Sequence, residues 1–302
     1  MKDLWGIDLG GTKIEGAVLD AETFKTKARL RIPTEQQHGY HHIIGQIKKM
    51  VGMLQDHTGQ TATHLGIGTP GSTDPKTGLL KNSNTVCLNK QPLFDDINKA
   101  LGIPVSMAND ANCFALAETR MGVVPDVCPD ARLVFGVIMG TGVGGGLVID
   151  SQVWNGKMGI GGEWGHTFLD ASGGPCYCGD IGCTEQVISG PALERFYAGV
   201  SGNSLKLKEI VLRYRENSDP HAVATIERLL HFFGRGLSNV INVLDPDVVI
   251  LGGGVGNIAE LYTLGVESLE KYIFNPRFET IIAKPKLGDS AGVFGAAFLA
   301  LR

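Results

Sequence analysis

The densest group of candidate metal ligands lies between residues 166 and 183. His166, Cys176, Cys178 and Cys183 follow the spacing His-x9-Cys-x-Cys-x4-Cys, with two glycines between the last two cysteines. Four such ligands match a closed, tetrahedral zinc site. Free buried thiols or a reactive pair are the alternative, but thiolates this crowded repel one another unless a metal neutralises them. Since a closed site leaves no position for water, we expect zinc to brace this loop rather than to catalyse.

Two carboxylates flank the candidate zinc site, Glu163 before it and Glu185 after it. Either could be a solvated surface acid or a helix cap, yet a constrained loop is a poor place for a merely solvated carboxylate. Carboxylates only accept hydrogen bonds, which suits the many hydroxyls of a sugar. The second ring nitrogen of His166 could join them, because metal-bound histidine usually donates its other N–H to a nearby acceptor.

A second candidate for chemistry is Asn109-Asp110-Ala111-Asn112, which follows a short apolar segment. A helix N-cap would explain one of these polar residues but not all of them. A hydroxyl that attacks phosphorus needs a carboxylate to take its proton, and a second group to orient the acceptor molecule. Asp110 fits the first role, as catalytic base, and Asn109 the second. This leaves Asn112 as the predicted cap.

Three glycine-rich turns each follow an apolar segment. Backbone N–H groups in such turns form concave sites for phosphate, whereas each turn alone could be an ordinary hairpin or strand end. No Walker loop or dinucleotide fingerprint is present. Asp8 would repel phosphate. It could instead bind, through water, a Mg²⁺ ion that bridges the phosphates. The expected phosphate-binding residues are Asp8, Gly10, Gly11, Thr12 and Lys13, then Gly140, Thr141 and Gly142, then Gly252, Gly253 and Gly254.

The elements that would position these residues alternate between strand and helix. Helical spacing of apolar residues predicts helices at 40–55, 93–101, from 111, over most of 188–244, from 258, and at 292–301. Short apolar runs predict strands at 4–8, 14–19, 25–32, 64–69, 105–108, 133–139, 147–149, 247–251 and 281–285. This alternation predicts an α/β architecture with helices on both sheet faces. We expect two domains, residues 1–108 plus 290–302 and residues 109–289, facing a cleft.

Composition excludes several classes of function. The chain of 302 residues carries a net charge of −4 and no basic run that could track nucleic acid. No apolar stretch reaches the ~20 residues that cross a bilayer. The N-terminus lacks the pattern of a signal peptide, so the cytoplasm is the expected compartment. Cys87, Cys113 and Cys128 are scattered, so the six cysteines do not form a disulfide framework. We expect no nucleic-acid or membrane partner.

Together these motifs resemble the ROK family (repressors, open reading frames and kinases) of actin-like sugar kinases, over essentially the whole chain. The resemblance implies a two-domain, actin-like (ribonuclease H-like) ATPase fold with the active site in the cleft, and ATP-dependent phosphorylation of a hexose with ATP, Mg²⁺ and a structural Zn²⁺. The matching segments are GIDLGGTK at 6–13, GTPG at 68–71, NDAN at 109–112, GTGVGGG at 140–146, EWGH at 163–166, CYCGDIGCTE at 176–185 and LDPDVVILGGG at 244–254.

The resemblance also assigns roles to residues. It makes Asp110 the catalytic base, and it implies phosphorylation at the 6-hydroxyl and a homodimer. The positions that hold the sugar are Asn109, Asp110, Glu163, His166 and Glu185, with Gly71 and Asn84 aligning with further sugar contacts. A non-catalytic sugar-binding module would need neither three phosphate turns nor this acid.

The segments that follow the GTPG turn, together with EWGH, look most like bacterial fructokinases that also accept mannose. Kinases of N-acetylglucosamine or N-acetylmannosamine and glucokinases stay open as alternatives. The family's repressors carry a helix-turn-helix domain ahead of the first phosphate turn. Since this chain starts directly at that turn, we expect a free kinase rather than a sugar-sensing transcriptional regulator.

Overall fold

The computed structural model describes residues 3–301, and the chain divides into two compact units. The first unit consists of Met1–Asp126, Gly146–Gly161 and Lys286–Arg302, and the second of Val127–Gly145 and Gly162–Pro285. The predicted domains, 1–108 plus 290–302 and 109–289, have different boundaries. Helix α3 (Asp110–Arg120) packs against α11 (Ala291–Phe298), so the segment that starts with Asp110 lies in the first unit.

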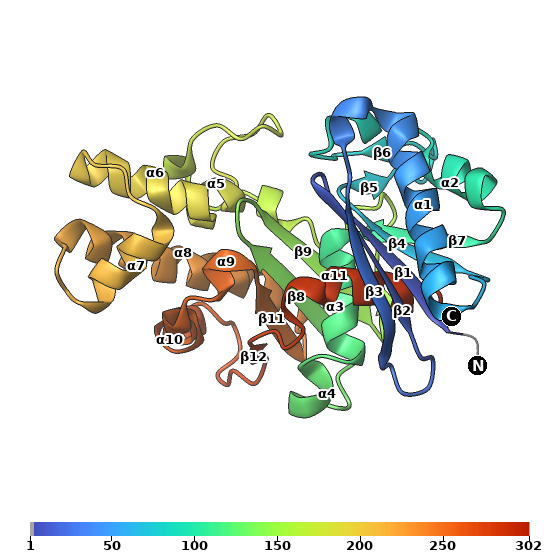
Figure 1. Cartoon of the computed structure of the whole chain (residues 1–302). Coiled ribbons are helices and arrows are strands. Elements are labelled where there is room, and N and C mark those ends of the chain that lie inside the picture. Colours follow the sequence, from blue (N-terminus) through green and yellow to red (C-terminus); the bar gives the residue numbers. More distant parts are fainter. Residues whose placement is uncertain (1–2, 302) are drawn as a thin grey trace. The chain divides into compact units, whose positions relative to one another are not determined.

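The first unit is built on a five-stranded sheet with strand order β3-β2-β1-β4-β7 (Figure 1). An antiparallel meander supplies three strands, and two further strands add to its β1 edge in parallel. The bounds are β1 Leu4–Leu9, β2 Lys13–Leu19, β3 Thr26–Pro33, β4 Leu65–Thr69 and β7 Val105–Asn109. Because β1 and β4 are covered on both faces, apolar residues run through them with little alternation.

Helices cover both faces of this sheet, and glycines set how closely they approach. On one face Gly16 leaves room for α1 (Tyr40–Thr58), since a Cβ there would lie 2.6 Å from the sulfur of Met50. On the other face a Cβ at Gly66 would lie only 1.7 Å from the carbonyl oxygen of Ala296 in α11, and Gly6 is similarly close. The sheet therefore accepts α11 only with glycine at these two positions.

The C-terminal segment is also bound through Glu118, a carboxylate in α3 with no exposed surface. Its oxygens accept hydrogen bonds from the backbone N–H groups of Val123 (2.9 Å), Lys286 (3.1 Å) and Leu287 (2.8 Å). Such charge-assisted bonds are stronger than neutral ones and satisfy an otherwise costly buried charge. Smaller elements of the unit are β5 Ser72–Thr73, β6 Leu80–Lys81, α2 Leu93–Leu101 and β10 Gln152–Val153.

The second sheet has the order β10-β9-β8-β11-β12, and β8, β11 and β12 run parallel. The boundary between the units falls within β9 (Val143–Ile149). The other strands of the second unit are β8 Leu133–Met139, β11 Val248–Gly252 and β12 Ile281–Ala283. Its helices are α5 Thr184–Ile188, α6 Gly190–Ser201, α7 Leu207–Arg215, α8 Pro220–Leu244, α9 Gly253–Gly256 and α10 Leu264–Glu270.

These elements confirm the predicted α/β architecture, with two local corrections. Strand β9 begins at Val143 rather than at Leu147, because glycines fit a crowded strand: a Cβ at Gly145 would lie 2.7 Å from the Phe135 ring. The helix predicted from residue 258 is instead a 3-10 turn, Ala259–Tyr262, followed by α10.

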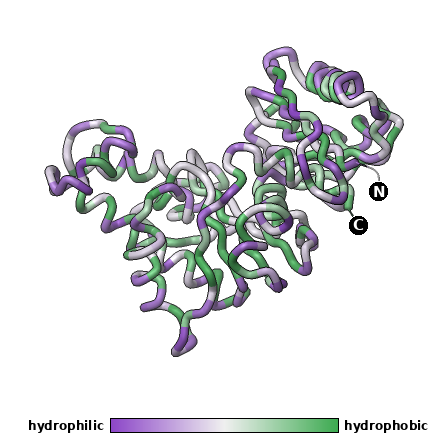
Figure 2. Tube along the Cα trace, turned by 60° about the horizontal axis from the view of Figure 1, so that its bottom comes forward, coloured by the Kyte–Doolittle hydropathy of each residue, from purple (hydrophilic) through white to green (hydrophobic). Residues whose placement is uncertain are grey.

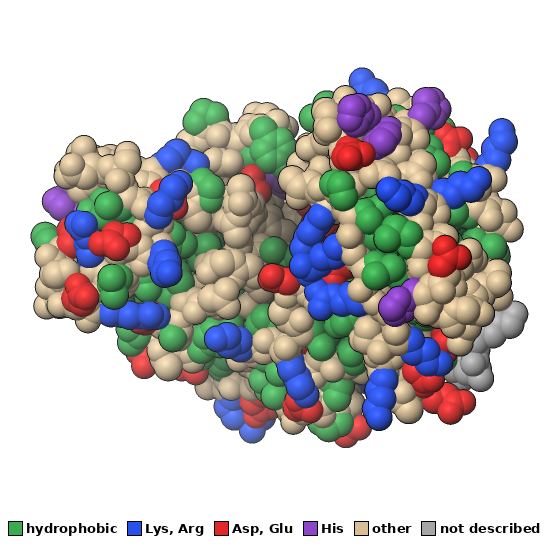
Figure 3. All heavy atoms as spheres, viewed as in Figure 1, with side chains coloured by type: hydrophobic (Ala, Val, Ile, Leu, Met, Phe, Trp, Pro, Cys, Tyr) green, Lys and Arg blue, Asp and Glu red, His purple; other side chains and the backbone are tan. Residues whose placement is uncertain are grey.

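Hydrophobic and hydrophilic residues are interspersed along the trace, and several tips of the chain are hydrophilic (Figure 2). Basic and acidic side chains are interspersed over the face in Figure 3, as expected for a net charge of −4. Within residues 3–301, no helix combines the length and the hydropathy needed to span a bilayer.

Candidate functional site

Asp110 lies at the junction of β7 and α3, where it is the first residue of the helix. The N-cap is Asn109, whose Oδ1 accepts a hydrogen bond from the backbone N–H of Asn112 at 2.8 Å. The prediction of Asn112 as the cap was therefore wrong, because the helix begins two residues before it. The Asn112 side chain instead accepts from the Leu147 N–H and donates to Asn155. Asn109 thus uses its oxygen for the helix and keeps its amide N–H groups for another acceptor.

The Asp110 carboxyl group is a strengthened base. Its side chain is exposed, yet dehydration by the surrounding protein is the largest influence on it and raises its pKa. A hydrogen bond from the Ala111 N–H, 2.8 Å long, acts in the opposite direction. A carboxylate that is exposed yet poorly hydrated can contact molecules from solvent. It would accept a proton more readily than an ordinary aspartate.

Asp8, near the end of β1, carries a charge that the fold disfavours. Its pKa is raised to about 6, first by burial and then by the negative charges of Asp110 and Glu15, against smaller opposing effects of Lys13 and Arg31. A poorly hydrated carboxylate beside another acid is stabilised by a cation. Oxygen ligands are those that Mg²⁺ prefers, so the position suits the predicted magnesium role.

We expect Asp8→Asn to stabilise the metal-free protein while removing Mg²⁺-dependent activity. At pH 7.5 the folded protein bears the cost of an ionised Asp8, and a rise from 3.8 to about 6 corresponds to roughly 3 kcal/mol at 1.36 kcal/mol per pH unit. Because the folded-state pKa exceeds the unfolded one, wild-type stability recovers as the pH falls from above 6 toward 3.8. The gain should therefore shrink at pH 4.5, which urea unfolding at both pH values would measure.

Asp20→Asn is the matched control for this prediction. Hydrogen bonds, first from the Thr23 N–H, lower the pKa of Asp20, so neutralising it should bring no stabilisation. A loss of stability in Asp8→Asn at pH 7.5 would contradict the charge-cost explanation.

The first glycine turn joins β1 to β2 in the first unit. The Gly10 N–H donates to the Lys13 carbonyl at 3.0 Å, and the Thr34 hydroxyl donates to the Gly10 carbonyl at 2.6 Å. Thr12 and Lys13 are exposed at the turn, and Gly11 lies partly buried against the hydroxyl of Thr85. These two hydrogen bonds stabilise the turn at Gly10, and the exposed Thr12 and Lys13 can contact an anion.

The second and third turns lie in the second unit, at the carboxyl ends of β8 and β11. Since these strands are parallel neighbours, their turns meet at one edge of the sheet. The Gly140 N–H donates to the Gly142 carbonyl at 2.8 Å, and Thr141 is exposed. Gly253 has φ of +81°, and a Cβ there would lie 2.2 Å from the Met139 carbonyl, so only glycine fits. These two turns form one glycine-lined surface, whereas the first turn belongs to the other unit.

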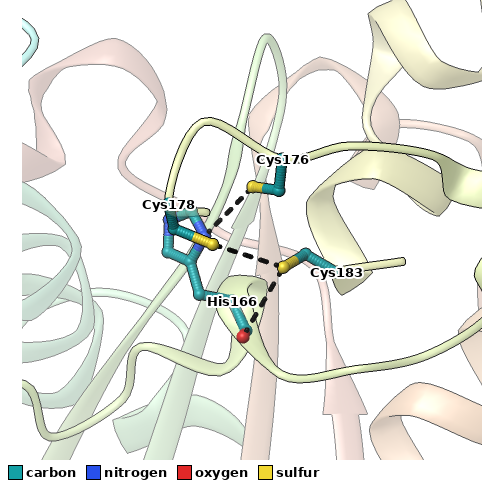
Figure 4. A group of neighbouring side chains, drawn as sticks. All are labelled: His166, Cys176, Cys178 and Cys183. Atoms are coloured by element: carbon teal, nitrogen blue, oxygen red, sulfur yellow. Dashed lines mark hydrogen bonds between the residues drawn. The ribbon is translucent and has the colours of Figure 1, made fainter. Parts of the chain in front are cut away.

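The predicted zinc ligands form a cluster in the second unit (Figure 4). Their ligand atoms all lie within 4.8 Å of one another: the closest pairs are Cys178 Sγ to Cys183 Sγ and Cys176 Sγ to His166 Nδ1, each 3.6 Å apart. Zn–S and Zn–N bonds of about 2.3 and 2.0 Å give tetrahedral edges of about 3.5–3.8 Å. A disulfide would need about 2.05 Å. The four side chains therefore fit a tetrahedral zinc ion.

The thiols of this cluster have unlike environments. Burial raises the pKa of Cys183 to about 12, whereas a hydrogen bond from the Asp180 N–H lowers that of Cys178. Zinc binds thiolates, so its binding would have to displace the proton from the buried Cys183.

His166 directs its two ring nitrogens to different partners. Nδ1 faces the cysteines, and Nε2 lies 2.9 Å from the Tyr177 hydroxyl. Tyr177, whose side chain is 78% exposed, therefore occupies the position at which we expected a sugar hydroxyl. Its place inside the CYCG motif was visible in the sequence, but the motif alone gave no sign of this contact.

Glu185 lies against the second glycine turn. Its Oε2 accepts a hydrogen bond from the Val143 N–H at 3.0 Å, and a Cβ at Gly142 would lie 2.5 Å from the same oxygen. Glu163 immediately precedes the 3-10 turn Trp164–His166 and is partly buried. The second unit thus brings both flanking acids and His166 into the neighbourhood of the cysteine cluster.

The remaining predicted sugar contacts lie in the first unit with Asn109 and Asp110. Gly71 has φ of +83°, and a Cβ there would lie 2.4 Å from the Lys81 carbonyl, so the turn requires glycine. Asn84 is exposed, and its Oδ1 is 3.5 Å from the Thr85 hydroxyl. The sugar residues predicted from the sequence therefore form two groups, one in each unit.

A cavity of about 310 Å³ opens within the first unit beside Asn109. Its walls come from stretches far apart in sequence, so no local motif indicated them. The lining residues are Thr69, Ser72, Thr73, Pro75, Phe94, Met107, Ala108, Asn109, Asn112, Asn155, Gly156 and Gly159.

Known proteins resemble this chain along nearly all of its length. The ROK family model matches residues 4–302. An N-acetyl-D-glucosamine kinase from Aliivibrio salmonicida is 35% identical over 308 residues, 99% of each chain. The crystal structure of the ROK hexokinase from Thermus thermophilus matches with a TM-score of 0.87 and 30% identity over 99% of this chain and 98% of that one. A ROK family glucokinase from Streptomyces griseus, in complex with glucose and AMPPNP, matches with a TM-score of 0.77 and 29% identity over 99% of both. These likenesses confirm the predicted actin-like α/β fold.

Proposed function

The chain belongs to the ROK family and is a sugar kinase, and from that premise we propose that it transfers the γ-phosphoryl group of ATP to the 6-hydroxyl of N-acetylglucosamine. Curated relatives at 34% and 35% identity are N-acetyl-D-glucosamine kinases, whereas the fructose reading rested on short loop segments. The proposal therefore adopts the alternative that the sequence left open. A homodimer, which the family resemblance implies, and a cytoplasmic location, expected from the N-terminal sequence, are part of the same proposal.

The observation that carries the proposal is the position and the raised pKa of Asp110. In the proposed reaction its carboxylate takes the proton of the 6-hydroxyl as the sugar oxygen forms its bond to the γ-phosphorus and the bond to the ADP oxygen breaks. Asn109 would donate its free amide N–H to a neighbouring sugar hydroxyl, since its oxygen caps α3. Catalysis then rests on holding the acceptor oxygen in line with the phosphate.

The glycine turns would hold the triphosphate through backbone N–H groups, and Asp8 would hold Mg²⁺ through water. When bound, Mg²⁺ neutralises charge on the phosphate oxygens. The partly buried Asp8 suits that ion because its own charge is poorly hydrated.

In the second unit, His166 and the three cysteines would hold structural zinc. The zinc loop would then hold Glu163 and Glu185 ready for the sugar, and His166 would bind it when a sugar hydroxyl replaces the Tyr177 hydroxyl at Nε2. Glu185 also accepts from the Val143 N–H beside the second glycine turn, so one carboxylate would serve both the sugar and the phosphate turn.

A panel of N-acetylglucosamine, N-acetylmannosamine, glucose, fructose and mannose tests the substrate. ADP release should show kcat/KM for N-acetylglucosamine exceeding that for each other sugar roughly tenfold to a hundredfold, the discrimination that a fitted pocket provides. Phosphorus NMR of the product should show the phosphate on carbon 6. Fructose as the preferred substrate would contradict the proposal and restore the fructokinase interpretation.

A further inference from the structure

The cavity in the first unit begins at the acceptor end of the site. Asn109 forms part of its wall and directly precedes the proposed base Asp110. Its other walls come from strands β4, β5 and β7, helices α2 and α3 and the loop 155–159. A molecule held by Asn109 therefore has this space beside it.

The lining combines one unpartnered hydroxyl with an apolar wall. Ser72 is only 9% exposed, and within residues 3–301 its Oγ has no hydrogen-bond partner. Buried polar groups are almost always paired, so this hydroxyl is free to pair with a bound molecule once rotation about χ1 turns it toward the cavity. The side chains of Pro75, Phe94 and Met107 provide the apolar part.

The other polar side chains of the cavity are mostly in use. Asn112 and Asn155 bond to each other, and the Thr69 hydroxyl lies 3.4 Å from backbone carbonyls. Asn109 retains only its amide donors, since its oxygen caps α3. No lining residue is charged. The cavity therefore suits an uncharged group with a carbonyl, an N–H and a small apolar end.

We infer that this cavity receives the 2-acetamido group of the sugar. Ser72, after rotation about χ1, would bond the acetamido group, and Phe94 and Met107 would contact its methyl. This inference deepens the proposed function and rests on it for the placement of the sugar. It makes Ser72 and Phe94 specificity residues that neither the motifs nor the family resemblance assigned.

The test measures binding rather than turnover, with 6-deoxy-N-acetylglucosamine and 6-deoxyglucose as ligands in calorimetry, because neither offers a 6-hydroxyl. Ser72→Ala should weaken binding of the acetamido ligand about tenfold relative to the glucose analogue, the value of one good hydrogen bond. Phe94→Ala should weaken it about fourfold, the value of one buried methyl group. Phe94 is 37% exposed, so its loss should leave the fold intact even if Ser72→Ala does not fold.

Ser238→Ala is the matched control, since this serine is also buried but lies in α8 of the second unit and donates to the Arg235 carbonyl. It should change the ratio of the two affinities less than twofold. If Ser72→Ala and Phe94→Ala weaken the binding of both ligands equally, or of neither, the pocket assignment is wrong. This is also the result expected if Ser72 bonds only to water. The proposed function would still stand if the wild type phosphorylates N-acetylglucosamine. Conversely, Ser72-dependent selectivity without turnover would sustain the pocket and overturn the proposed reaction.

Discussion

Asp110→Asn should lower kcat about 10²- to 10⁴-fold, the usual contribution of a general base, while sugar affinity changes little. The amide keeps the shape of the carboxylate, and its oxygen can still accept the 2.8 Å hydrogen bond from the Ala111 N–H. It cannot take a proton from the acceptor hydroxyl. Steady-state ADP release gives kcat, and calorimetry with the sugar alone gives the affinity.

Asp126→Asn provides the control for this substitution. Asp126 is an exposed acid of the same unit, paired with the Lys286 ammonium group 2.6 Å away. Losing such a surface pair costs about 1 kcal/mol or less and should leave kcat within twofold of the wild type. Wild-type turnover in Asp110→Asn would exclude it as the base.

Cys178→Ser should release zinc and lower the melting temperature of the second unit by more than about 10 °C, because structural zinc sites contribute many kcal/mol to folding. Cys178 is exposed, so the serine itself removes little packing and the loss reports on the metal. Sugar affinity should fall with stability, since Glu163 and Glu185 flank the same loop. Metal content by mass spectrometry and thermal unfolding with and without a chelator would measure both effects.

Cys128→Ser is the control, a single thiol of the second unit that lies outside the cluster. It should retain zinc and unfold like the wild type. If verified zinc-free protein bound sugar and unfolded as the zinc-loaded protein does, the architectural role of the site would be wrong.

The features that the sequence predicted well are formed by residues that lie close together in the chain. The cysteine cluster comes from one stretch of 18 residues, so spacing alone could indicate it. The alternation of strands and helices follows from apolar periodicity, whereas the strand order is known only from the structure. The cap of α3 was misassigned because asparagines occur at both 109 and 112, and only the length of β7 decides which one begins the helix.

What the sequence could not predict depends on segments that meet only after folding. The cavity has walls from residues as far apart as Thr69 and Gly159, and the unpartnered hydroxyl of Ser72 is recognisable only once every neighbour is placed. The choice between fructose and an N-acetylhexosamine depends on that kind of surface. Loop similarity therefore favoured fructokinases, whereas curated relatives that match over the full length include N-acetylglucosamine kinases.

The chain order of the two units has a consequence for biosynthesis. Every residue of the second unit precedes Lys286, whereas the first unit needs α11 and the backbone groups that Glu118 binds. Because domains fold as the ribosome delivers them, the second unit has all its residues first, although the chain begins with the other. Until α11 has been synthesised, the nascent sheet exposes the glycine face at Gly6 and Gly66. During that interval a chaperone could bind the uncovered face of β1 and β4, the strands that are synthesised early in this chain.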